Sequence, residues 1–166
     1  MICKDAFLKV IQRQTEGLMY HDGMTDYYTF LQLDCLKDLH HKQTKDELCN
    51  LRKSKHLFIS TFGTLPFYSA SDPKVIPADW KSKTNTEVDE QTLKLLIKST
   101  LANYLTWEQE TCEIYKTVAH VLKENMNFPL YREVCDLIED VQKEICKIDK
   151  MIVDAASYGY APSYFK

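Results

Sequence analysis

The chain has 166 residues, a formal net charge of −3, and only 4 glycines and 5 prolines. A domain of this length buries enough apolar surface to fold without disulfides or a structural metal. So few turn-forming residues exclude an all-β protein of many short strands and favour a small number of long helices. The slightly acidic balance also disfavours a general affinity for nucleic acids.

The expected compartment and redox state follow from features that the sequence lacks. No apolar run approaches the roughly 20 residues that span a bilayer, and residues 1–5 do not begin a signal peptide. The six cysteines are scattered without a Cys-x-x-Cys pair. This spacing is typical of reduced, mostly buried thiols rather than of disulfides or a zinc site. We therefore expect a cytoplasmic protein that makes no membrane contact.

Helical periodicity predicts the first two helices over about 5–30 and 35–62, because apolar residues recur there at steps of three and four. Gly23 could bend the first helix or end it early. The second is expected to end at Gly63, since glycine commonly follows the last turn of a helix. The apolar link between the two helices (29–34) could be a tight turn or a continuation.

Residues from about 63 to 88 form the one long irregular stretch. Three prolines interrupt it and forbid a continuous helix. A loop this long is uncommon in a compact domain unless it crosses the fold or has a function of its own. Because it contains Phe67, Tyr68, Ile76 and Trp80, we predict a packed crossover, after which the second and third helices run parallel.

The remaining sequence predicts two further helices and a short tail. The third helix is expected to start at a capping box at residues 86–89 and to run to about Glu124. The fourth is expected to run from Pro129, a residue suited to a first helical turn, to Gly159. An aromatic tail (158–166) follows. The four segments predict one all-α domain (1–166), an antiparallel four-helix bundle.

Polar residues on the apolar stripes are the candidates for function, because sites in helical bundles are built from inward-facing polar side chains. One acid falls on the stripe of each of three helices, namely Glu47, Glu108 and Glu144. His21 and His40 fall on the stripes of the first and second helices. Carboxylates with nearby histidines are ligands suited to iron or manganese. These five residues therefore form the candidate metal site.

Each candidate also has a simpler interpretation, because periodicity fixes a helix face only to within about one residue. Glu47 and Glu144 could form exposed ion pairs with basic residues beside them. His40 could mark an exposed helix start, and His21 could be a buried histidine bonded to a backbone or tyrosine partner. Both interpretations stay open on the sequence alone.

Helix pairs joined by a long crossover, with inward acids, resemble the ferritin-like superfamily. Residues 20–21 and 36–40 are similar to the histidine-bearing first helix and the Leu-His start of the second helix in starvation-type (Dps-like) ferritins. Residues 101–151 resemble their last two helices. The stretches 20–24 and 75–80 resemble short uncharacterised proteins of Gram-positive bacteria and their prophages. The resemblance implies a ferritin-like fold, assembly into oligomers and a metal site that uses iron or manganese.

The sequence departs from the ferritin pattern at the metal ligands. Di-iron ferritins have Glu-x-x-His on the second and fourth helices, whereas here Glu47 is followed by Asn50 and Glu144 by Lys147. No Glu-x-x-His occurs anywhere in the sequence. A lysine at a ligand position is protonated and repels a cation. The resemblance thus supports the fold and weakens the expectation of ferroxidase activity.

Two functions from different classes fit these patterns. The first is a non-catalytic, ferritin-like assembly or interaction protein, either a homo-oligomer or the ligand of another protein. Its metal site would have decayed to a polar layer, and its contact surfaces would be the aromatic tail and the Trp80 loop. The alternative is a metal-binding relative that stores or oxidises iron. Nucleic-acid contact through the basic residues of the second helix is the weakest interpretation.

Overall fold

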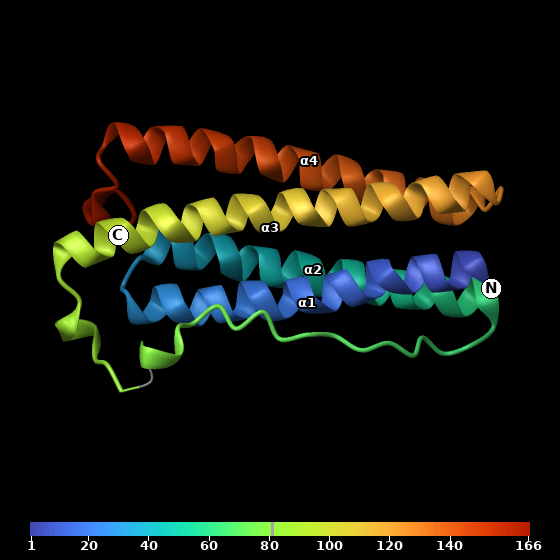
Figure 1. Cartoon of the computed structure of the whole chain (residues 1–166), viewed down its shortest axis with the longest axis horizontal. Coiled ribbons are helices and arrows are strands. Elements are labelled where there is room, and N and C mark those ends of the chain that lie inside the picture. The colour runs from blue at the N-terminus through green and yellow to red at the C-terminus, as the bar shows by residue number, and fades with distance from the viewer. Residues whose placement is uncertain (81) are drawn as a thin grey trace.

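The computed structural model describes residues 1–80 and 82–166. It consists of four long helices, α1 (Ile2–Phe30), α2 (Asp34–Phe62), α3 (Glu90–Glu124) and α4 (Phe128–Ser157), and three short 3₁₀ helices, η1 (Ala78–Trp80), η2 (Asn85–Glu87) and η3 (Pro162–Tyr164). The described residues contain no strand. The long helices lie side by side (Figure 1), which confirms the predicted all-α four-helix bundle.

Two antiparallel hairpins make up the bundle. α1 packs along α2, α3 packs along α4, and contact between α1 and α3 joins the hairpins. α2 and α4, in contrast, scarcely approach each other. In Figure 1 the segment between α2 and α3 runs back along the bundle, so that α2 and α3 point in the same direction. The bundle is therefore closed on the α1–α3 side and open on the α2–α4 side.

The apolar link between α1 and α2 is a tight turn rather than a continued helix. The amide of Leu33 donates to the carbonyl of Tyr28 at 3.0 Å, and Leu33 is fully buried. Gln32 reverses the chain with a φ of 58°. At the other end of α2, Gly63 adopts the left-handed conformation (φ 64°) that glycine reaches without steric cost.

The start of α3 differs from the prediction in its capping residues. α3 is capped by Asp89, whose carboxylate accepts a 2.7 Å hydrogen bond from the amide of Thr92. A capping box at residues 86–89 was expected there and is wrong. The box instead joins Thr84 and Glu87 and caps η2. Two capping motifs therefore follow one another before the helix begins.

Gly23 does not bend or end α1, which is continuous to Phe30. A Cβ atom at Gly23 would lie only 2.6 Å from Cγ2 of Val75. Such a distance is too short for two carbon atoms in van der Waals contact. The glycine therefore serves the close approach of the crossover to α1 rather than a kink.

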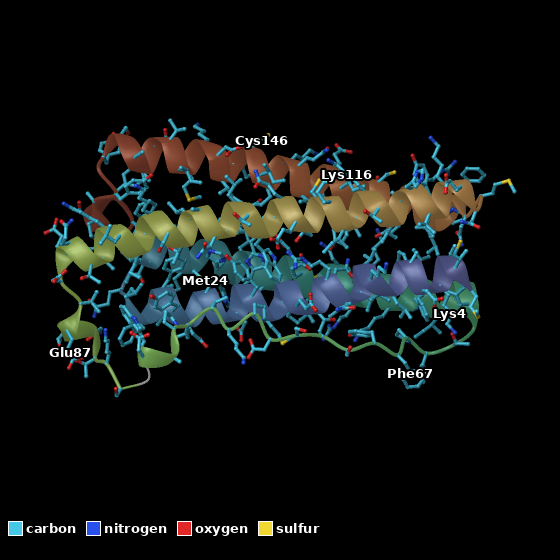
Figure 2. All side chains as sticks on the ribbon, in the orientation of Figure 1. Lys4, Met24, Phe67, Glu87, Lys116 and Cys146 are labelled. Carbon is cyan, nitrogen blue, oxygen red and sulfur yellow. The ribbon has the colours of Figure 1, made fainter. Side chains whose placement is uncertain are left out.

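The crossover packs against the helices at some points and exposes apolar side chains at others. Thr15 donates a 2.9 Å hydrogen bond to the hydroxyl of Tyr68, and Trp80 lies edge-on to an aromatic ring of α1. Phe67, however, is 82% exposed and extends away from the helices (Figure 2). Ile76 is 43% exposed. Packing was thus predicted correctly for Tyr68 and Trp80 and wrongly for Phe67 and Ile76.

The buried apolar residues form two clusters, one toward each end of the bundle. The cluster at the end with the α3–α4 turn includes Phe7, Phe58 and Leu122. The cluster at the end with the aromatic tail includes Leu36 and Leu101. The polar candidate residues lie at or beside the boundary between these clusters.

The cysteines differ from the prediction in their burial. All six lie among the described residues and are free thiols, but only Cys112 is buried. Cys35, Cys49 and Cys146 are exposed, so the expectation of mostly buried thiols is wrong.

None of the described helices has an apolar stretch long enough to cross a bilayer.

Candidate functional site

The five residues predicted from the sequence come from all four helices and face the interior. His21, His40, Glu108 and Glu144 are buried, and Glu47 is partly buried. His40 therefore does not mark an exposed helix start. The structure divides the five residues into a histidine pair and a group of three acids.

His21 and His40 contact each other. Their Nδ1 atoms are 2.9 Å apart, and only one of these two nitrogens can hold the proton between them. His21 Nε2 also lies 3.5 Å from Oε1 of Glu108. If the proton is on His40, His21 accepts at Nδ1 and carries its own proton on Nε2, the nitrogen that faces the carboxylate. Burial, and then the electrostatic effect of the neighbouring His21 ring, hold the pKa of His40 well below its usual value.

The histidine pair contacts Glu108 through His21. Glu108 is the only one of the three acids in contact with either ring among the described ion pairs and hydrogen bonds. His40 Nε2, at the far end of the pair, is shielded from solvent and has no hydrogen-bond partner among the described residues. The order Glu108–His21–His40 thus runs from the site toward the aromatic interior.

A cavity of about 410 Å³ lies between α2 and α4, on the open side of the bundle. The three candidate acids line it, Glu47 from α2, Glu108 from α3 and Glu144 from α4. Tyr115 of α3 lines it as well. The structure therefore gathers the acids at one cavity and places the histidines behind Glu108.

Two contacts bound this cavity along the bundle. On one side Lys53 of α2 forms a 3.0 Å ion pair with Glu133 of α4. On the other side the C-terminal tail returns to α2, where the amide of Cys35 donates to the carbonyl of Phe165 at 2.9 Å. Phe165 itself is buried. The opening between α2 and α4 is thus confined to the middle of the bundle, where the acids lie.

Glu144 has a partner for each carboxylate oxygen. Tyr104 of α3 donates a 3.0 Å hydrogen bond to Oε1. Lys147 Nζ lies 3.6 Å from Oε2. The simpler interpretation of Glu144 as a surface ion pair is therefore correct for Lys147, although the carboxylate itself is buried.

Glu47 has no ion-pair partner among the described residues, and its Oε2 is shielded from solvent without a hydrogen bond. The carboxyl group lies against α1 at Gly17, where an added Cβ would be 3.4 Å from Cδ of Glu47. Burial, and then the negative charge of Glu108, raise the pKa of Glu47 to about 8. Glu47 therefore keeps its proton at neutral pH.

Glu47 and Glu108 also affect the ionisation of the Tyr115 hydroxyl. Burial, followed by the charges of Glu47 and Glu108, raises the pKa of its phenol well above the usual value. The cavity floor therefore presents carboxyl groups and a neutral hydroxyl, all of them oxygen donors. In the described conformation, no group of three or more histidine, cysteine, aspartate or glutamate side chains among the described residues is arranged to hold a metal ion.

The closed side of the bundle contains a stack that the sequence patterns did not reveal. The guanidinium of Arg13 lies 3.5 Å from the ring centroid of Trp107, and Trp107 stacks in parallel on Tyr20 at 4.5 Å. Arg13 also donates to Thr111 Oγ1 at 2.8 Å and to the carbonyl of Trp107 at 2.9 Å. The seven-residue spacing of Arg13 and Tyr20, two turns on one helix face, was the available signal.

Other residues of α1 and α2 also have shielded polar atoms without a hydrogen-bond partner. The side-chain amide of Gln14 and the hydroxyl of Ser54 are buried without hydrogen bonds among the described residues. His56 and His120 are exposed. No protein-family model matches the sequence, and no curated protein matches it. The geometry of the site is therefore the basis for a functional proposal.

Proposed function

We propose that this chain is a ferritin-like bundle protein that binds a divalent metal ion, iron or manganese, in the cavity between α2 and α4. The supporting observation is that Glu47, Glu108 and Glu144 line one cavity from three different helices. Oxygen donors of this kind suit iron and manganese. A proton on Glu47 and the ammonium group of Lys147 at Glu144 offset the cost of burying these acids together. A bound cation could replace both, and the unpartnered Oε2 of Glu47 is available to it.

The donor types fit a metal ion, but binding needs two local changes. Glu47 must lose its proton, and Lys147 must release Glu144. Glu108 is already oriented by His21 from behind, as outer-shell histidines and carboxylates orient ligands in metal sites. Oxidation of iron(II) by dioxygen or peroxide is the chemistry that the ferritin-like resemblance implies for iron at such a site.

Metal analysis of the purified protein tests this proposal. Protein purified under reducing conditions is stripped with a chelator, incubated with Mn²⁺ or, without oxygen, with Fe²⁺, and analysed after gel filtration. We expect about one metal ion per chain or more, and a loss of at least tenfold in affinity for Glu108→Gln, since a charged ligand becomes neutral.

The matched control is Glu113→Gln, which removes the same charge from α3 at an exposed residue paired with Lys116. This variant is expected to bind as the unaltered protein does. Equal metal content in Glu108→Gln and the unaltered protein would reject the cavity as the site. No binding by any of the proteins would reject the function.

Assembly through the aromatic tail is a second candidate, favoured by a different observation. Tyr158 and Tyr164 are exposed, and their rings stack at 4.9 Å on the surface. Tyrosine contributes strongly at protein interfaces because it buries a large rigid ring with a polar end. Trp80 and Phe165, by contrast, pack onto the bundle, so the proposed contact surface is reduced to the two tyrosines.

Light scattering during gel filtration tests the second candidate. The unaltered protein is expected to elute as an oligomer at micromolar concentration, and Tyr158→Ser/Tyr164→Ser as a smaller species. Phe67→Ser, which changes an exposed ring on the crossover instead, serves as the control. A strict monomer before substitution would reject assembly.

A further inference from the structure

Lys147 lies at the mouth of the acid-lined cavity, one helical turn after Glu144 on α4. Its Nζ faces Oε2 of Glu144 at 3.6 Å, while Tyr104 holds Oε1 at 3.0 Å. Only 11% of the Glu144 side chain is exposed, against 67% for Lys147. The carboxylate belongs to the cavity, and the ammonium group reaches it from the solvent side.

We infer that Lys147 is the built-in counter-cation of this cavity and sets how tightly the cavity binds a metal ion. The inference rests on the proposed function. The ammonium group neutralises the acid that a metal ion would use, and its charge repels a dication approaching the same oxygens. Because the lysine is largely exposed, the pair is weak and the side chain can move out into water. Lys147 should therefore lower the metal affinity without abolishing binding.

Lys143 provides a matched control on the same helix. It also lines the cavity, and 65% of its side chain is exposed. Its Nζ, however, pairs at 3.0 Å with Glu139, which does not line the cavity. Replacing Lys143 removes the same charge from the same mouth but frees no acid of the site. A difference between the two lysines therefore reports the contact with Glu144 and not the net charge.

The experiment compares Lys147→Gln, Lys143→Gln and the unaltered protein. Each chelator-stripped protein is titrated with Mn²⁺, and free Mn²⁺ is measured by electron paramagnetic resonance. We expect Lys147→Gln to bind Mn²⁺ about fivefold more tightly than the unaltered protein, the size of a weak exposed ion pair near 1 kcal/mol. Lys143→Gln is expected to stay within about twofold, because the exposed charge of Lys143 is already paired with Glu139.

The outcomes separate this inference from the proposed function. Equal affinities in Lys147→Gln and Lys143→Gln, with binding in the unaltered protein, would overturn the role of Lys147 and keep the metal site. Binding by Lys147→Gln alone would show that Lys147 blocks the site instead of weakening it, and would reject metal binding by the natural sequence. No binding in any of the three proteins would overturn both. Circular dichroism of each variant confirms that the bundle is intact.

Discussion

The two sides of the bundle differ in how their buried charged side chains are partnered. One is the side where α1 meets α3, and the other is the side where α2 faces α4. On the α1–α3 side, Arg13 is buried but fully engaged by Thr111, the carbonyl of Trp107 and the Trp107 ring. On the α2–α4 side, the helices stay apart and a cavity lined by acids remains between them. The buried guanidinium of the closed side has partners for its charge, although the hydroxyl of Tyr20 beside it has none, whereas the open side leaves the carboxyl oxygen Oε2 of Glu47 without a partner.

The inner face of α2 shows the contrast most clearly. Each of its shielded side-chain atoms without a partner, His40 Nε2, Glu47 Oε2 and Ser54 Oγ, belongs to a residue that points into the bundle. The described residues of α3 and α4 contain no such atom. Unpaired buried polar atoms cost stability. Of the three residues, only Glu47 lines the cavity, so a ligand there could satisfy Glu47 Oε2. α1 also contains such atoms, in Gln14, Tyr20 and Tyr27.

The largest effect should come from breaking the closed side with Trp107→Ala. This substitution removes the ring between Arg13 and Tyr20. We expect the free energy of unfolding to fall by about 3 kcal/mol, the low end for replacement of a tryptophan by alanine, because Trp107 is only partly buried. Urea unfolding followed by circular dichroism measures it. Trp107→Phe, which retains an aromatic face, should cost about 1 kcal/mol. A loss below about 1 kcal/mol for Trp107→Ala would show that the stack does not hold the hairpins together.

A smaller effect is expected from the pH dependence of the open side. The pKa of Glu47 is raised to about 8 in the folded protein, so the folded state binds this proton more tightly than the unfolded chain does. The stabilisation is full below the usual carboxyl pKa and is lost as the pH rises toward 8. Between about pH 6.5 and 9, the unaltered protein should lose about 2 kcal/mol relative to Glu47→Gln, which cannot titrate.

The measurement is urea unfolding of both proteins at several pH values, and its readout is the difference between them. Other titrating groups affect both proteins alike, so they cancel in this difference. Glu113→Gln replaces an exposed residue of α3. Its free energy of unfolding should change with pH in parallel with that of the unaltered protein. Parallel curves for Glu47→Gln as well would mean that Glu47 is ionised and solvated at neutral pH.

The sequence predicted features within single helices better than it predicted the cavity between α2 and α4. The helix ends at Gly63 and near Pro129 were found to within a few residues, because glycine and proline act through their own local geometry. The inward direction of Glu108 was also predictable, since it stands four residues after Tyr104 on one helix face. These features depend on neighbours within a single helix.

What the sequence could not predict depends on how two helices are placed against each other. Nothing in the period of α4 shows that Glu144 meets Tyr104 of α3, or that α2 stays away from α4. The two histidines were expected at the same site as the acids, but the register of α1 on α2 pairs them with each other. The burial of the cysteines was also predicted wrongly, because it depends on which helix faces are covered by a neighbouring helix.

The smallest change in stability should come from Ser54→Ala, which tests whether the unpartnered hydroxyl on α2 destabilises the fold. The hydroxyl of Ser54 is buried without a partner and lies two turns after Glu47 on one helix face. Removing it relieves a desolvation cost, so the free energy of unfolding should rise by about 0.5 to 1 kcal/mol. Ser60→Ala is the control, because the exposed hydroxyl of Ser60 bonds to the carbonyl of Leu57 and its replacement changes mainly helix propensity. A gain for Ser54→Ala beyond that of Ser60→Ala, with unchanged Mn²⁺ affinity, would place this hydroxyl outside the site. A loss of stability would show that the hydroxyl has a partner after all, such as an internal water, and that the open side is less unsatisfied than its protein atoms indicate.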